Sequence, residues 1–147
     1  MKINKAKILY FLMLSLFISG CKEKLEIEYS FFNNIELEKG KHKLLVFPLE
    51  GEIIDDFTHF YIEDISTLKK MQQEWVFKHK SDIMPCGYGY LLMLVDEDSI
   101  INKESINIDC EYMSGWIYFP KKYLTDYQKS FIKMNESQKA EFAAKYR

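Results

Sequence analysis

The chain has 147 residues, with 20 Lys or Arg against 22 Asp or Glu, and this length suits one domain with a single core. No basic block stands out, which argues against nucleic acid as a partner and against electrostatic docking on anionic lipid. Aromatic residues are abundant, with ten Tyr, eleven Phe and two Trp. We expect them to fill an aromatic core, and a stacking platform for sugars or peptides is the alternative.

The first 20 residues differ in character from the rest of the chain. Three lysines lie within the first seven residues, residues 8–18 form an apolar run, and small residues then lead to Cys21. This order is typical of a secretory signal. A transmembrane helix is the alternative, but eleven apolar residues at ~1.5 Å of rise each fall well short of a ~30 Å hydrocarbon core.

The end of this segment, Ile18-Ser19-Gly20-Cys21, resembles the lipobox of bacterial lipoproteins. The resemblance implies that a signal peptidase cuts between Gly20 and Cys21. It also implies that the Cys21 thiol receives a diacylglyceryl group and that the freed amine is acylated. The aliphatic position, usually Leu in this family, is Ile18 here. Two or three acyl chains are enough for stable attachment to a bilayer.

The resemblance divides the chain into a signal peptide over residues 1–20, a short membrane tether over 21–24 and a single globular α+β domain over 25–147. It places the mature protein in the bacterial cell envelope, outside the cytoplasm. Lys22 follows the cysteine where Asp would signal inner-membrane retention in some bacteria, which favours the outer membrane if the cell has one. Three basic residues and no acidic residue leave with the signal, so 17 basic side chains remain against 22 acidic ones and the net charge is −5.

The first half of the mature chain predicts short strands. Residues 25–31 alternate apolar and polar side chains, the period of a strand with one wet face. Residues 35–38 and 43–47 flank a Lys-Gly turn candidate and predict a hairpin. An acidic segment then predicts a loop, and a further short strand is expected over 57–62.

A helix and three strands are expected next. Ser66 can cap a helix that runs to about Lys80, because apolar residues recur at helical spacing along one face. Residues 88–95 form a nearly continuous apolar run between glycines and three acidic residues, which predicts the central strand. Residues 105–110 alternate again, and 116–119 predict a further strand.

The C-terminal part predicts helices. Thr125 and Gln128 form a Thr-x-x-Gln capping-box pattern that would open one helix, and a second helix is expected from about Glu136 to Tyr146. The fold class expected from all these elements is α+β. We expect an antiparallel sheet of about five to seven strands packed with two or three helices.

Cys86 and Cys110 are the two cysteines that remain once Cys21 is lipidated. If the hairpin turns about Asp98, residues whose numbers sum to 196 face each other, and Cys86 then faces Cys110. Opposed residues in antiparallel strands lie ~4.5–5.5 Å apart at Cα, inside the range of a disulfide. The oxidising environment outside the cytoplasm permits this bond in an exported protein. Glu104, which this register sets opposite Leu92, is the point where a bulge could shift the pairing.

The sequence also contains weaker candidates for chemistry. Cys86 beside glycines invites a nucleophile hypothesis, with His42, His59 or His79 as base, but the expected disulfide would leave no thiolate. Two Ser-x-x-Lys spacings, at residues 66–69 and 130–133, lack the partner motifs of a serine hydrolase.

Acidic residues offer two further candidates. Residues 50–56 hold four carboxylates without the glycine position of a calcium loop, so a solvated loop is expected. Glu104, Asp109 and Glu111 could supply a carboxylate pair for glycoside cleavage. The histidine spacings support no zinc site. We therefore expect no catalytic residue, no metal and no cofactor.

Three functional hypotheses remain open. The first is a membrane-anchored lipoprotein that is a non-enzymatic binding or interaction module, with the lipid bilayer and an envelope protein as partners. The second is an immunity or inhibitor protein against an envelope-acting toxin or hydrolase, because a charge of −5 suits a basic target. The third is an envelope hydrolase, which requires a cleft with convergent ionisable groups.

Overall fold

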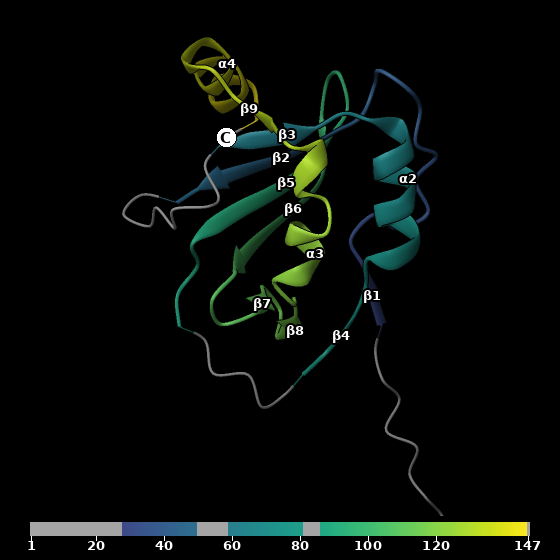
Figure 1. The fold of residues 1–147 in the computed structure, drawn as a ribbon, viewed down its shortest axis with the longest axis vertical. Coiled ribbons are helices and arrows are strands. Elements are labelled where there is room, and N and C mark those ends of the chain that lie inside the picture. Colours follow the sequence, from purple (N-terminus) through teal and green to yellow (C-terminus); the bar gives the residue numbers. More distant parts are fainter. Residues whose placement is uncertain (1–27, 50–58, 81–85, 147) are drawn as a thin grey trace, which may run out of the picture.

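The computed structural model describes residues 28–49, 59–80 and 86–146, so the predicted signal, the lipobox-like Ile18–Cys21, the predicted tether and the acidic segment lie outside the described residues. Seven strands form an antiparallel sheet in the order β8-β7-β6-β5-β2-β3-β9 (Figure 1). Its strands are β2 Lys43–Pro48, β3 Phe60–Ile62, β5 Tyr90–Val95, β6 Ile100–Asn107, β7 Tyr112–Met113, β8 Ile117–Tyr118 and β9 Ile132–Lys133.

The remaining elements pack on or beside this sheet. A second antiparallel sheet joins β1 and β4. These strands and the helices are β1 Glu28–Ser30, β4 Val76–Lys78, α2 Ile65–Glu74, α3 Lys122–Thr125, the 3₁₀ turn η1 Gln128–Ser130, and α4 Glu136–Tyr146. The predicted α+β class is confirmed. No helix in the described parts has the length and apolar character needed to cross a membrane.

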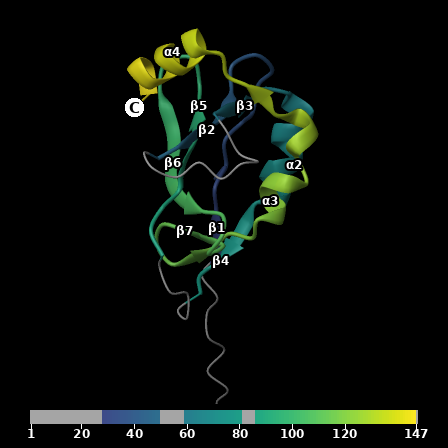
Figure 2. The same ribbon diagram turned by 60° about the vertical axis from the view of Figure 1, so that its left-hand side comes forward.

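The central strands are buried on both faces because the chain covers both sides of the sheet. On one face, Leu44 and Val46 belong to a large core that includes Leu68 of α2 and Leu124 of α3. On the other face, Leu45 and its neighbours form a smaller core with Phe142 and Tyr146 of α4. Figure 2 shows α2 and α3 together on one side of the molecule and α4 apart from them. This two-sided burial explains the continuous apolar run of β5, and the expectation that β5 is the central strand is confirmed.

The β5–β6 register is the predicted one over most of its length. Tyr90 pairs with Ile106 and Leu92 pairs with Glu104, and the register shifts only between Leu94 and Val95, near the hairpin loop. The shift therefore leaves the other end of the hairpin in register.

The predicted Cys86–Cys110 disulfide is confirmed, with 6.5 Å between the two Cα atoms. The regular ladder ends at Tyr90 and Ile106, before it reaches the cysteines. Asn107 continues the connection with its side chain, donating to the Gly87 carbonyl at 2.9 Å and accepting from the Cys110 N–H at 2.8 Å.

The predicted hairpin between 35–38 and 43–47 is wrong. β2 pairs with β3 on one side and β5 on the other, so both of its edges are occupied. Residues 35–38 form no strand and instead run beside α2, where Gln72 donates to the Ile35 carbonyl at 2.7 Å. A long-range pairing of apolar strands replaces the local one because it buries both faces of β2.

The predicted helix from Ser66 to Lys80 is correct in place but wrong at both ends. Asp64 is the cap, since its side chain accepts the Thr67 N–H at 2.8 Å. The helix ends at Glu74, and residues 76–78 form β4 against β1. The β-branched and aromatic pair Val76-Phe77 favours a strand once a partner strand is available.

The capping box predicted at Thr125 and Gln128 is wrong, and the box lies ten residues later. Asn135 accepts the Gln138 N–H at 2.8 Å, and the Gln138 side chain accepts the Asn135 N–H at 3.0 Å. This reciprocal pair opens α4, whose predicted span Glu136–Tyr146 is confirmed. The chain before it instead adds β9 to the edge of the sheet beside β3.

Candidate functional site

A hollow of about 500 Å³, which we call the aromatic groove, lies beside β4 and β8. These two strands and β1 are at the end of the molecule opposite α4 (Figure 1). The groove is lined by Val76, Phe77, Lys78, Glu111, Tyr118, Pro120, Lys122 and Tyr123. Its volume is in the range of small-ligand sites, and aliphatic or aromatic side chains make up most of its wall.

The floor of the groove is continuous with the aromatic core. The Phe77 ring lies 5.2 Å from that of Tyr123 and 5.3 Å from that of Phe119, and Trp75 packs on all three. Edge-to-face and tilted contacts of this kind fix the rings in place. The floor is therefore a rigid apolar surface.

Backbone contacts between β4 and β8 hold the two walls together. His79 bridges to Ile117, and the Lys80 N–H donates to the Trp116 carbonyl at 2.8 Å. Within β8, Ile117 is buried and Tyr118 is exposed, and Trp116, in the turn just before the strand, is exposed as well. The exposure of Tyr118 follows from the two-residue period of the strand.

The polar rim of the groove is organised by Glu111. Its carboxylate accepts from the Tyr118 hydroxyl at 3.1 Å and from the Lys121 N–H at 3.0 Å. The hydrogen bond to Glu111, followed by burial, raises the pKa of Tyr118. The Lys80 and Lys122 ammonium groups lie over the Tyr118 and Tyr123 rings, at 5.1 and 5.6 Å. The result is an apolar floor with an amphipathic edge.

The turn between β7 and β8 holds Trp116 in an unusual backbone conformation. Gly115 and Trp116 have φ values of +79° and +64°. A positive φ is ordinary for glycine and uncommon for a bulky aromatic residue. Trp116 is nonetheless 48% exposed. Backbone strain of this kind persists where the surrounding structure fixes it, and it clusters at functional positions.

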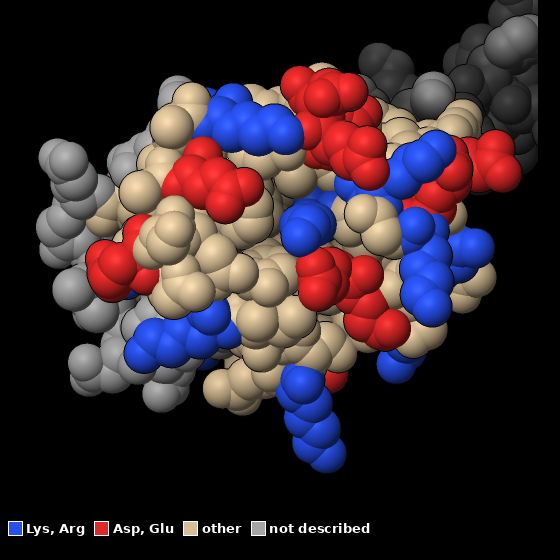
Figure 3. All heavy atoms as spheres, turned by 90° about the horizontal axis from the view of Figure 1, so that it is seen from above, with Lys and Arg blue, Asp and Glu red and all other residues tan. Residues whose placement is uncertain are grey.

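A second hollow of about 260 Å³, which we call the α4 cleft, lies between α4 and the ends of β2 and β5. Three lysines and three acidic residues line it, namely Lys41, Lys43, Lys145, Asp96, Glu97 and Glu141. Figure 3 looks onto this end of the molecule and shows basic and acidic side chains interleaved over its surface. The cleft therefore has no dominant charge.

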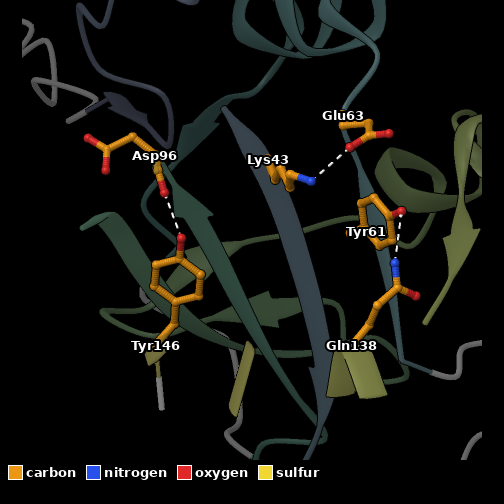
Figure 4. A network of polar contacts seen from close by, with 6 residues as sticks. All are labelled: Lys43, Tyr61, Glu63, Asp96, Gln138 and Tyr146. Carbon is orange, nitrogen blue, oxygen red and sulfur yellow. Dashed lines mark hydrogen bonds and ion pairs between the residues drawn. The ribbon is translucent and has the colours of Figure 1, made fainter. Parts of the chain in front are cut away.

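Polar contacts attach α4 at this cleft (Figure 4). The Tyr146 hydroxyl donates to the Asp96 carbonyl at 2.7 Å, and Gln138 donates to the Tyr61 hydroxyl at 3.3 Å. Lys43 forms an ion pair with Glu63 at 2.9 Å. The first two contacts hold α4 against the sheet, and the ion pair joins β2 to the residue that follows β3.

The structure does not assemble the nucleophile that was the alternative to the disulfide. Cys86 is in the disulfide and has no free thiol. His42 accepts the Glu38 N–H at its Nδ1, at 3.0 Å, the His59 ring packs edge-on against Phe47, and His79 lies in the backbone bridge to β8. Each histidine therefore has a separate structural contact.

The two segments with Ser-x-x-Lys spacing meet in space through Thr67 of one and Ser130 of the other. Ser66 donates to Asp64 at 2.5 Å, and Ser130 hydrogen-bonds to Thr67 at 3.0 Å. The second contact joins η1 to the first turn of α2, and the first lies within the cap of that helix. They account for both hydroxyls as structural groups.

The candidate carboxylates occupy different networks. Glu104 accepts from Tyr29 at 2.7 Å and from Ser114, whereas Glu111 forms the rim of the groove. Burial, and then the contact with Glu104, raises the pKa of Tyr29 to about 12. Within the described ranges no three His, Cys, Asp or Glu side chains are placed to hold a metal ion.

Sequence reasoning missed the aromatic groove, although one signal was present. Residues 116–119 are expected to form a strand, in which Trp116 and Tyr118 would share the face opposite Ile117; both are exposed, although β8 includes only Tyr118. The sequence gives no such signal for the walls from β4 and α3. The helical spacing of the preceding segment predicts a helix over residues 76–78.

These features define an α+β protein with a disulfide-closed central hairpin and an aromatic groove at one end. Comparison with known proteins finds no matching family model, no matching curated protein and no matching solved structure.

Proposed function

We propose that this protein is a lipoprotein of the bacterial envelope, anchored through acylated Cys21, and that it is a non-enzymatic binding or interaction module. The observation that carries the proposal is the Cys86–Cys110 disulfide in a chain whose N-terminal region contains a lipobox-like sequence. Disulfides persist in exported proteins and are rare in the cytosol. The two features lie 65 residues apart and point to the same compartment.

The aromatic groove supports a binding role. A hollow with an apolar floor and a few polar groups at its edge suits the capture of an amphipathic surface or ligand. The groups at that edge, Glu111 and the two ring-stacked lysines, are already engaged with tyrosine side chains. Because these groups are held by the tyrosines, they can orient a bound surface, and the arrangement supports a binding role better than a role in proton transfer.

Metabolic labelling with an alkyne fatty acid tests the anchor. We expect the label to enter the chain and to be lost in Cys21→Ser, which should also leave the membrane fraction. The matched control is Cys86→Ser with Cys110→Ser, which removes two other cysteines and should keep the label. A wild-type chain that never takes up the label would overturn the proposal.

The second candidate is an immunity or inhibitor protein, favoured by the net charge of −5 of the mature chain. Affinity capture from detergent-solubilised envelopes distinguishes the two. Recovery of one basic enzyme in equimolar amount, with loss of its activity on binding, would support the inhibitor. Recovery of only wall material would count against it.

A further inference from the structure

Exposed apolar side chains gather at one end of the molecule. Among the described residues, six large hydrophobic side chains are exposed, and four of them lie on β4, on β8, in the turn before β8, or on the segment that packs against β7. We call these four the membrane face: Val76, Tyr88, Trp116 and Tyr118. The Tyr88 ring lies 5.2 Å from that of Tyr112 in β7, which joins it to this end.

The chain enters the described fold at the same end. Glu28, the first residue of β1, pairs with Lys78 of β4, and Lys78 lines the aromatic groove. Seven residue steps separate Cys21 from Glu28, a reach of at most about 25 Å for a fully extended chain. An acyl group on Cys21 would therefore keep this end of the domain close to the bilayer.

The chemistry of the membrane face matches the headgroup region of a bilayer. Trp and Tyr are enriched at membrane interfaces because their rings are apolar while their N–H or O–H groups stay hydrated. Lysines beside them can lay their stems on apolar surface and keep the ammonium group in water, as Lys80 and Lys122 do over tyrosine rings.

We propose that the membrane face docks onto the bilayer that holds Cys21, with Trp116 in the headgroup region and α4 at the far end. This inference rests on the proposed acylation. The Trp116 backbone has a positive φ, and its carbonyl accepts a hydrogen bond from the Lys80 N–H. The backbone that carries the indole is therefore already ordered before it meets the bilayer. Because the mature chain has a net charge of −5, docking depends on the aromatic residues and not on electrostatic attraction.

The two tryptophans make the test specific. Trp75 is fully buried, and Trp116 is 48% exposed. The acylated full-length mature chain is reconstituted into phosphatidylethanolamine–phosphatidylglycerol vesicles, some with acyl chains brominated near the headgroup. The Trp116→Phe variant measures the fluorescence and quenching that come from Trp75 alone. Flotation of the vesicles measures anchoring separately from docking.

We expect brominated lipid to quench Trp116, and iodide quenching to fall about twofold or more relative to soluble Cys21→Ser, because an interfacial indole loses its aqueous contacts. Added salt should leave both effects unchanged. The double variant Val76→Ser with Tyr118→Ser should reduce the lipid quenching. The matched control is Ile100→Ser with Ile132→Ser, the other two exposed apolar side chains, and it should not.

Three results would overturn the docking. A chain that floats with vesicles while iodide reaches Trp116 as in Cys21→Ser leaves the anchor intact and refutes the docked orientation. A chain that neither takes up label nor floats refutes the anchor and the docking together. Concentration-dependent shielding of Trp116 without vesicles would assign the face to a second copy of the chain.

Discussion

Asp64 begins α2 with a dense set of hydrogen bonds. Its carboxylate accepts from the Thr67 N–H at 2.8 Å, the Thr67 hydroxyl at 2.7 Å and the Ser66 hydroxyl at 2.5 Å. These bonds, with that from Ser66 as the largest cause, lower the pKa of Asp64 to about 2. The charged form is therefore favoured in the folded protein.

The sign of the pH effect follows from that shift. A carboxylate whose pKa is lower in the folded state stabilises the fold above its ordinary pKa of 3.8, and this contribution is lost as pH falls towards 2. We expect Asp64→Ala to lower the urea midpoint at neutral pH and to flatten its decline between those two pH values. The exposed Asp126→Ala is the matched control, and an equal change in both variants would contradict the role of Asp64.

At the scale of residues, the sequence predicts a contact correctly where the two residues lie on neighbouring strands joined by one loop. The Cys86–Cys110 bond followed from alternation on two strands joined by one loop. The cap of α2 was missed because Ser66 is also a good cap residue, and choosing Asp64 requires knowing where the chain leaves β3. Trp116 and Glu111, with φ of +64° and +50°, carry no residue-type signal for such conformations.

At the scale of elements, α4 is held to the sheet by a small set of side chains. Phe142 and Tyr146 pack on the second core, and the Phe142 ring lies 5.8 Å from the Tyr61 ring in an edge-on contact. Neither α2 nor α3 has a side chain in this core. The attachment of α4 therefore depends on the few residues that face the sheet.

We expect Phe142→Ala to destabilise the docked helix by about 3 kcal/mol, the typical cost of truncating a buried phenylalanine. Hydrogen exchange should become faster across residues 136–146 while β5 and β6 stay protected, because the larger core on the other face is untouched. Ala144→Ser, an exposed position on the same helix, serves as control. Uniform loss of protection over the whole sheet would show that α4 is not a separate unit.

Element type was predictable for segments with a long pattern and ambiguous for short ones. Residues 90–95 belong to a long apolar run of strand length, and residues 136–146 form a helix over their whole predicted span. Residues 76–78 and 132–133 continue helical spacing from the segments before them, yet both become strands. Their backbone groups find partners on β1 and β3, and the sequence does not show which strand edges are open.

At the scale of the whole molecule, the disulfide closes a loop of 24 residues that contains the β5–β6 hairpin. It lies at the end opposite the hairpin loop, where the regular ladder has already stopped. The bond therefore holds together two chain segments that backbone pairing leaves apart. One of these segments leads on to β7 and then to β8, whose Tyr118 lines the aromatic groove.

Removing the disulfide should cost stability without changing the fold. For a loop of this length the chain-entropy relation gives roughly 3.5 kcal/mol. We expect the Cys86→Ala, Cys110→Ala double variant to unfold at correspondingly lower urea, with an unchanged near-UV spectrum. In the wild-type protein, isolated without reductant, Cys86 and Cys110 should resist thiol alkylation until the protein is reduced, and two freely reactive thiols would contradict the bond.

The sequence by itself determined the α+β class, the central strand, the last helix and the cysteine pair, because each depends on side-chain period or on residues joined by a single turn. Its lipobox remains the basis for the predicted anchor. Only the tertiary structure decided the partners of β2, the end of α2, the edge strand β9 and the aromatic groove. These depend on hydrogen bonds and burial between segments far apart in the chain, which no local pattern encodes.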